Sequence, residues 1–531
     1  MFWKLSIEII YLYSLILLIL LYFNRKTAID FVKQLIKEKP LSGKTPAQIV
    51  IIISILSFLF ICLIYALTVP PIIYDSFAYH VPIINDIADN GQKTHYLVEN
   101  NIYENRVNNF PFFWETAVGG VKFYSEFFEW KLILFVILAM LLLLIVLISD
   151  YLKINPIFGV VFFSLSNLII IFGLEFLSDI FLTMLFLGSA YLMFKFIETN
   201  KYRFLILCAF GNGLMILTKF TGIAFFCGFA AYLFFKKGPK VSLGFSIIAL
   251  IISATFYLPK IISGSFIGAT VSSLGIYGDP LTTNVWTILL NLKLFIEIIG
   301  IETISSGFFI LIPFALIIGF LTIQNKKQLD VAKFLFLELL IFVVGTIVNK
   351  GQPNFYGTQR YIFPIFALSV VFTGLTSDFL IKRKGTLKKI VIIIIVGICI
   401  AQGALLTNYM TKRIQTEYNN SFEEKNFGLR QFIPNNENIK ILYLTGEPLI
   451  LGMENTQAID YTTKIKFYAP ACDFFRENNI THLVSIRTNE LGPPVQQELI
   501  KSFQQEMKKG DSCMKKLFSN GNWMNIFEVK Q

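Results

Sequence analysis

The first 407 residues consist largely of apolar runs separated by short polar loops. A helix that crosses the ~30 Å hydrocarbon core of a bilayer needs roughly 17–25 residues. The runs therefore predict an α-helical polytopic membrane protein with about 12–13 transmembrane helices. The segment 286–300 is apolar enough to be a further span or a helix that lies in the membrane interface. The other predicted spans are 7–23, 48–69, 131–148, 156–173, 180–197, 204–218, 222–235, 242–258, 304–323, 333–349, 361–378 and 389–406.

Charge divides the chain into two parts. Only 15% of all residues are charged, against about 25% in an average soluble protein, which excludes a disordered chain and an ordinary cytosolic enzyme. Residues 408–531 nevertheless carry 15 basic and 14 acidic residues, which is close to the soluble average. We therefore expect a transmembrane body at 1–407, followed by a small soluble extracytoplasmic domain at 408–531.

The basic residues also orient the body. Alternate loops hold 21 Lys and Arg with a net charge of +15, whereas the loops on the other side have a net charge of −5. Basic loops face the cytoplasm, so the loops 70–130, 174–179, 259–303 and 349–360 and the tail face outward. The overall charge of +11 is then a signature of orientation, and no nucleic-acid partner is required.

The tail has the pattern of a small α/β domain. Residues 440–444 (KILYL), 482–486 (HLVSI) and 523–529 (WMNIFEV) resemble strands, and residues 472–478 precede the second strand as a helix. Cys472 and Cys513 are the only cysteines in the tail. Disulfides persist outside the cytoplasm, so these two are candidates for a bridge.

The first outward loop contains several side chains that can act in catalysis or bind a ligand. It begins at Asp75-Ser76-Phe77-Ala78-Tyr79-His80-Val81-Pro82, directly after the second span. In a helix, Asp75 and Tyr79 would share a face, and His80 is a candidate ligand or hydrogen-bond partner. The alternative is structural: Asp75 caps an interfacial helix, and the aromatic residues near 109–115 form an interfacial belt.

Further charged residues occur on the outward side. Glu175 and Asp179 are an acidic pair with no basic residue nearby in the sequence, which suggests a cation or a polar ligand. Lys219 and Arg360 are basic side chains of the kind that hold phosphate. The structural alternatives are solvation of the acids and snorkelling of the basic side chains to the interface. Glu338 falls inside a predicted span and is a weaker candidate.

The stretch from Asp75 to Pro82 resembles the Asp-Ser/Ala-x-x-Tyr-His-x-Pro signature of bacterial GT-C glycosyltransferases, a class that includes protein O-mannosyltransferases and the lipid A aminoarabinose transferase. Other segments that resemble this family 39 type are Asp179, Lys219-Phe220-Thr221-Gly222 and Arg360-Tyr361-Ile362-Phe363-Pro364. The resemblance implies a GT-C-like fold in the bacterial cytoplasmic membrane, with its active site on the outer face.

The resemblance also implies a polyprenyl-phosphate-linked sugar donor and a lipid A, glycan or protein acceptor. Asp75 would be the general base for the acceptor hydroxyl, and a single displacement would invert the anomeric carbon. Asp179 would be the second catalytic acid. Tyr79, His80, Glu175, Lys219, Arg360 and Tyr361 would bind substrate. No P-loop occurs, in agreement with a donor that is not a nucleotide.

A divalent cation is an open option in this interpretation. Its candidate ligands are Asp179, Glu175 and His80. These are oxygen and nitrogen donors without cysteine, a set that favours Mg²⁺ or Mn²⁺ over structural Zn²⁺. Metal use differs within the class, so the sequence leaves the cation undecided.

Two other function classes compete. A transporter or flippase would also have many spans, but internal repeats are expected of such folds and the sequence shows none. A lipid-linked oligosaccharide polymerase or ligase is closer, and would be expected to carry a large outer loop rich in Arg and His. The first outer loop here holds few basic residues.

Overall fold

The fold comes from a computed structural model of the whole chain. It describes residues 59–60, 62–64, 67, 80, 83–84, 87–88, 98–99, 113–124, 132–164, 178–219, 221–262, 284–305, 319–347, 362–372, 374–375, 433, 439–445, 457–460, 471–486, 512–519 and 524–530. The predicted spans 7–23 and 389–406 lie outside these residues, and the spans 48–69 and 304–323 lie largely outside them.

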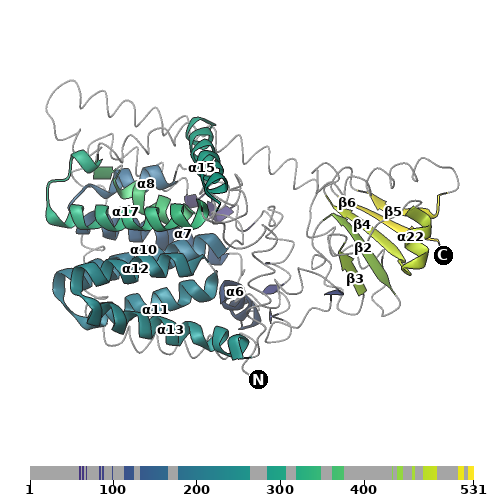
Figure 1. Cartoon of the computed structure of the whole chain (residues 1–531), viewed down its shortest axis with the longest axis horizontal. Coiled ribbons are helices and arrows are strands. Elements are labelled where there is room, and N and C mark those ends of the chain that lie inside the picture. Colours follow the sequence, from purple (N-terminus) through teal and green to yellow (C-terminus); the bar gives the residue numbers. More distant parts are fainter. Residues whose placement is uncertain are drawn as a thin grey trace.

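The body is a bundle of helices (Figure 1). Three of the described helices are long and apolar enough to cross a membrane, over Leu132–Tyr151, Ser178–Thr199 and Pro239–Leu258. The helices are α6 Phe113–Tyr124, α7 Leu132–Tyr151, α8 Pro156–Ser164, α10 Ser178–Thr199, α11 Tyr202–Thr218, α12 Gly222–Lys237, α13 Pro239–Ile262, α15 Val285–Ser305 and α17 Lys326–Ile347.

One helix departs from the common direction. In Figure 1, α15 lies across the direction shared by α10, α11, α12 and α17. It contacts α17 through Phe295 and Phe342, whose ring centroids are 6.4 Å apart. The sequence left 286–300 open between a span and an interfacial helix, and this crosswise orientation favours the interfacial helix.

The interior of the bundle is aromatic. Phe186 of α10 lies 5.2 Å from Phe225 and 5.6 Å from Phe229 of α12, and 6.0 Å from Phe334 of α17, measured between ring centroids. These four side chains are fully buried. Tilted and edge-on ring contacts of this kind stabilise packing beyond the area that they bury, so α10 is held in the centre of the bundle.

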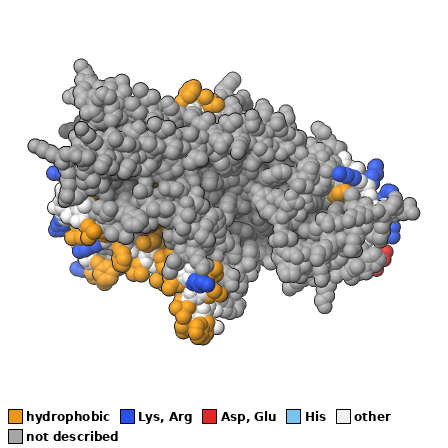
Figure 2. Space-filling model, turned by 90° about the horizontal axis from the view of Figure 1, so that it is seen from above, with side chains coloured by type: hydrophobic (Ala, Val, Ile, Leu, Met, Phe, Trp, Pro, Cys, Tyr) orange, Lys and Arg blue, Asp and Glu red, His pale blue; other side chains and the backbone are white. Residues whose placement is uncertain are grey.

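The surface of the bundle is apolar. Side chains such as Phe235, Leu243 and Ile251 are exposed by 77%, 63% and 64%, as expected where the solvent is lipid. Figure 2 shows such hydrophobic surface beside Lys and Arg side chains at the end of the bundle away from the sheet. This end carries the loops that the charge pattern assigns to the cytoplasm.

The tail forms a mixed sheet in the order β1-β3-β2-β4-β6-β5. The first four strands are parallel, whereas β6 runs antiparallel to both β4 and β5. The elements are β1 Val98–Glu99, β2 Lys440–Thr445, β3 Gln457–Asp460, α22 Ala471–Glu477, β4 His482–Ile486, β5 Met514–Ser519 and β6 Met524–Val529. The predicted strands correspond to β2, β4 and β6, so the small α/β unit is confirmed.

The sheet is not built from the tail alone. Its edge strand β1 belongs to the first outward loop and pairs with β3, Val98 opposite Ala458 and Glu99 opposite Ile459. The loop that follows the second predicted span is therefore joined to the tail by backbone pairing. A strand of two residues gives no recognisable pattern in the sequence.

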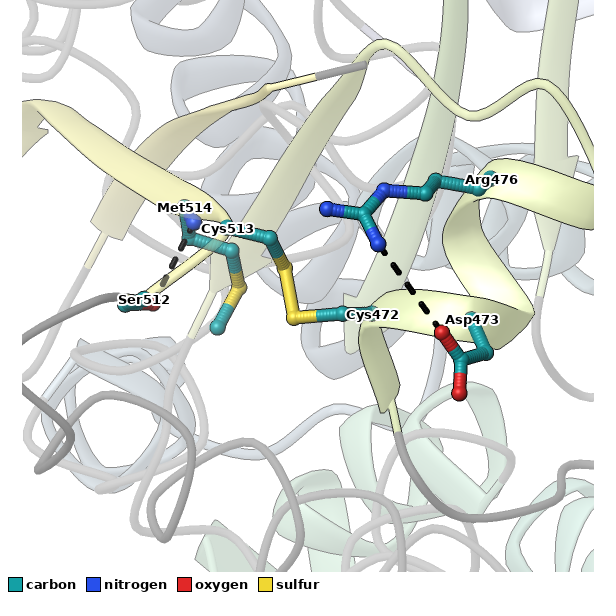
Figure 3. The surroundings of a disulfide bond; sticks show 6 residues. All are labelled: Cys472, Asp473, Arg476, Ser512, Cys513 and Met514. Carbon is teal, nitrogen blue, oxygen red and sulfur yellow. Dashed lines mark hydrogen bonds and ion pairs between the residues drawn. A yellow bond between two sulfur atoms is a disulfide. The ribbon is translucent and has the colours of Figure 1, made fainter.

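A disulfide links the helix of the tail to the start of a strand. Cys472 of α22 is bonded to Cys513, which directly precedes β5 (Figure 3). Both sulfur-bearing residues are buried in a small core with Phe474, Phe475 and Leu483. The predicted bridge is thus present in the structure, and it closes a loop of 41 residues around a core that is small for an independent domain.

Candidate functional site

An ion pair joins two of the predicted residues at the end of the bundle that the charge pattern predicts to face outward. The Lys219 ammonium nitrogen lies 2.5 Å from Oδ1 of Asp179, forty residues earlier. The Asp179 side chain is 1% exposed and the Lys219 side chain 18%. The sequence places no basic residue near Asp179, but the contact between α10 and α11 supplies one.

The two charges also suit the helix ends on which they lie. Asp179 is in the first turn of α10, where the helix dipole stabilises an anion. Lys219 follows the last residue of α11, where the dipole stabilises a cation. Thr183 donates a hydrogen bond of 2.7 Å to the Asp179 carbonyl and closes this first turn. The arrangement fixes a positive group that is still partly accessible at the end of the bundle.

A second charged contact involves His80. Nδ1 of His80 contacts Oε1 of Glu115, which lies in the first turn of α6. The His80 side chain is 3% exposed and the Glu115 side chain 0%. Glu115 was not among the predicted site residues. The signal that could have found it is a lone carboxylate directly after the aromatic stretch that ends at Trp114.

Aromatic contacts connect α6 to the helices that carry the ion pair. The Trp114 ring stacks on Phe181 at 5.0 Å between centroids, and Phe113 lies 6.1 Å from the same ring. Phe113 also belongs to a buried cluster with Leu217. Phe181 is two residues after Asp179, and Leu217 is two residues before Lys219. The two charged contacts are thus parts of one packed region.

Five of the predicted site residues lie outside the described part of the chain: Asp75, Tyr79, Glu175, Arg360 and Tyr361. Their roles stay predictions. The structure therefore brings together Asp179 with Lys219, and places His80 beside a carboxylate that the sequence had not singled out.

Of the three candidate metal ligands, two are described by the structure and one is not. Asp179 contacts Lys219, His80 contacts Glu115, and Glu175 lies outside the described residues. Within the described part of the chain, no three His, Cys, Asp or Glu side chains form a group that could hold a metal ion. At Asp179, the Lys219 ammonium is a cationic partner that the protein itself provides.

Glu338 lies elsewhere. Its side chain is 1% exposed in the middle of α17, and a Cβ atom added at Gly228 of α12 would come within 2.3 Å of its carboxyl carbon. The missing side chain at Gly228 therefore makes room for this carboxyl group between the two helices. Glu338 thus packs inward against α12, away from the Asp179–Lys219 ion pair.

A family model described as dolichyl-phosphate-mannose-protein mannosyltransferase matches residues 121–262, from the end of α6 to the end of α13. This segment includes both members of the Asp179–Lys219 ion pair. A search of curated proteins returns no significant match.

Solved structures match over most of the chain. ArnT from Cupriavidus metallidurans is 11% identical with a TM-score of 0.57, covering 90% of this chain and 97% of that one. The archaeal oligosaccharyltransferase AglB from Archaeoglobus fulgidus is 12% identical with a TM-score of 0.50, covering 81% and 69%. The arabinofuranosyltransferase AftD from Mycobacteria is 13% identical with a TM-score of 0.51, covering 91% and 40%. The resemblance to the GT-C glycosyltransferases is confirmed, and the chain shares their fold.

Proposed function

We propose that this membrane protein is a glycosyltransferase that moves a sugar from a polyprenyl-phosphate donor to an acceptor hydroxyl at the outer face of the bacterial cytoplasmic membrane. The observation that carries the proposal is the buried Asp179–Lys219 ion pair at the outward end of the bundle. It lies in the segment matched by the mannosyltransferase family model. Among the structures that share the fold, one shows ArnT bound to undecaprenyl phosphate and another shows AglB with a dolichol-phosphate.

The ion pair has a clear use in such a reaction. When the sugar leaves its donor, negative charge collects on the departing phosphate, and a positive group fixed nearby stabilises that charge. Lys219 supplies a point charge, and Asp179 holds its flexible side chain in one position. Arg360 would add a second, bidentate contact to the phosphate. Asp179 then acts by orienting Lys219, whereas Asp75 acts on the acceptor.

Asp75 is assigned as the general base. It removes the proton of the acceptor hydroxyl while the oxygen attacks the anomeric carbon, the bond from that carbon to the phosphate oxygen breaks, and polyprenyl phosphate leaves. One displacement of this kind inverts the anomeric carbon. Tyr79, Glu175 and Tyr361 complete the proposed sugar and phosphate contacts.

The test of this assignment is transfer of a labelled sugar by membranes that contain the protein. Asp75→Asn should fold normally and lose at least ~100-fold in transfer. Asp150→Asn is the matched control, because Asp150 is an exposed carboxylate at the opposite end of the bundle. Normal transfer by Asp75→Asn would overturn the base assignment, and uptake of label without cleavage would indicate a transporter.

A lipid-linked oligosaccharide donor is the second candidate. The structure that favours it is AglB, which is named as an oligosaccharyltransferase and shares the fold. Supplying membranes with a labelled monosaccharide donor and a labelled oligosaccharide donor in parallel separates the two. Release of polyprenyl phosphate only from the oligosaccharide donor would replace the first proposal with this one.

We assign the tail a role in acceptor choice. It is joined to the first outward loop by the pairing of β1 with β3, and so is tied to the loop that carries Asp75. Deletion of residues 408–531 should change which acceptors are used while the body still hydrolyses its donor slowly in water. Unchanged acceptor choice would contradict this role.

A further inference from the structure

We propose that Glu115 is a positioning residue, which makes α6 a dock that holds the first outward loop at a fixed distance from the Asp179–Lys219 ion pair. The inference rests on the proposed function for its kinetic consequences, but its structural part can be tested separately. It concerns a carboxylate to which neither the sequence pattern nor the resemblance gives a role.

The first step of the argument is the burial of Glu115. Its carboxylate is 0% exposed, and its Oε1 atom contacts Nδ1 of His80, 35 residues away. A carboxylate so deeply buried is expensive unless a specific partner compensates it. The first turn of a helix favours the negative charge, and His80 adds a directional contact to the outward loop. Glu115 therefore selects one placement for His80.

A second contact lies one helical turn further along. A Cβ atom added at Gly119 of α6 would be 2.8 Å from Cγ2 of Ile87 and 3.0 Å from the carbonyl oxygen of Ile84. Gly119 is four residues after Glu115, and Ile84 is four residues after His80. The two contacts on the loop residues thus have the same spacing as the two contacts on α6. We call the loop residues His80, Ile83, Ile84, Ile87 and Ala88 the docked segment; all five are buried.

The third step is the attachment of α6 to the ion pair. Trp114, next to Glu115, is fully buried and stacks on Phe181 at 5.0 Å. Phe113 packs against Phe181 and with Leu217. These partners are two residues from Asp179 and Lys219, respectively. The short helix α6 therefore contacts the docked segment with one face and contacts α10 and α11, the helices at which the ion pair lies, with another.

This arrangement has a consequence for the reaction. Asp75, the proposed base, comes five residues before His80 in the sequence, and His80 is the first residue of the docked segment. The proposed phosphate-binding charge is Lys219. In a single displacement, the acceptor oxygen and the leaving oxygen must lie on opposite sides of one carbon, and a misplacement of about 1 Å can cost ~100-fold in rate. Glu115 and Gly119 set that alignment without contacting the substrate.

The kinetic test uses Glu115→Gln, Glu115→Asp and Gly119→Ala in the full-length protein. We expect Glu115→Gln and Gly119→Ala to lower kcat by at least ~10-fold while the KM for the donor changes by less than about twofold, since Lys219 is untouched. Glu115→Asp should recover part of the rate. Gly244→Ala is the matched control, because a Cβ atom there meets nothing within 4 Å. A loss in kcat explained entirely by a smaller folded fraction would overturn the proposal.

A double variant tests whether Glu115 acts through His80. If it does, Glu115→Gln combined with His80→Gln should lose no more activity than His80→Gln alone. Losses that multiply would show two independent effects and would contradict the proposal.

The structural test needs no enzymatic activity. Amide hydrogen exchange of the peptide that covers the docked segment should be faster in Glu115→Gln and Gly119→Ala than in the wild type, with α10 and α11 unchanged. Equal exchange in wild type and variants would overturn the docking role. If the wild type transfers no sugar from any polyprenyl-phosphate donor, the proposed function fails, and the exchange experiment alone decides whether α6 is a dock.

Discussion

The two ends of the helical bundle use charge differently. At the end that the charge pattern assigns to the cytoplasm, Glu198 accepts contacts from both Lys195 and Lys327, and its side chain is 33% exposed. Both lysines also lie over the ring of Tyr151, at 5.5 Å and 4.6 Å from its centroid. At the other end, the buried Asp179 carboxylate pairs with the partly accessible Lys219 between helix ends. The Glu198 carboxylate is thus exposed and shared between two lysines, whereas the Asp179 carboxylate is buried beside Lys219.

The difference in exposure between these ion pairs indicates which of them must keep a fixed geometry. An exposed pair contributes about 0–1 kcal/mol, because water and salt screen it. A buried pair can cost as much in desolvation as it gains, but losing one partner is severe. Buried carboxylates occur at both ends of the bundle, as Asp179 beside Lys219 and as Asp330 beside Lys236. In the proposed reaction, the Asp179–Lys219 pair is the one that must hold a side chain still.

The largest expected effect is at Lys219. Lys219→Met leaves the buried Asp179 carboxylate without its ammonium partner and should destabilise the protein by ~3–5 kcal/mol, with loss of sugar transfer. Thermal unfolding and transfer assays on the purified protein measure both. The double variant with Asp179→Asn should recover much of the stability but no activity. Recovery of transfer in the double variant would show that the outward pair is only structural.

An intermediate effect is expected at Lys236. Its ammonium group contacts Asp330, whose side chain is 8% exposed, and Tyr232 donates a hydrogen bond of 2.9 Å to the Asp330 carbonyl. Lys236→Met leaves a mostly buried acceptor unsatisfied and should cost about 1–3 kcal/mol. Transfer per folded molecule should not change, because the pair lies at the cytoplasmic end. A selective loss of transfer would break the distinction between the two ends.

The smallest effect is expected at Lys327. It is 35% exposed, and Lys195 remains to contact Glu198 when it is lost. Lys327→Met should change stability by less than ~1 kcal/mol, and the change should disappear in high salt because exposed charges are screened. Urea or thermal unfolding at two ionic strengths measures this. A loss as large as that of Lys219→Met would show that exposure does not separate the two ends.

Within the described part of the chain, the sequence predicted several helices of the bundle well, because hydropathy is a local property. The spans 180–197, 204–218 and 222–235 correspond to α10, α11 and α12, which differ from them by two residues at most at either end. The helix α17 begins at Lys326 rather than at 333. Its first two turns carry Lys326, Lys327 and Asp330, which interrupt the apolar run but do not interrupt a helical backbone.

The sheet was predicted only in part. The strands β2 and β4 are apolar runs in the sequence, whereas β3 (QAID) and β5 (MKKLFS) have too few apolar residues to be distinguished from loops. The strand β1 belongs to another part of the chain and depends on pairing with β3. Strand pairing over such a distance has no local signal.

The sequence by itself determined the helical membrane body and the small α/β tail, and it predicted that Asp179 and Lys219 lie on the same side of the membrane. These follow from hydropathy and charge, which are properties of neighbouring residues. Only the tertiary structure decided that Asp179 pairs with Lys219, that His80 meets Glu115, and that the first outward loop adds a strand to the tail. Those contacts join residues 35 or more positions apart, and their distances depend on how helices and strands pack rather than on the composition of any one segment.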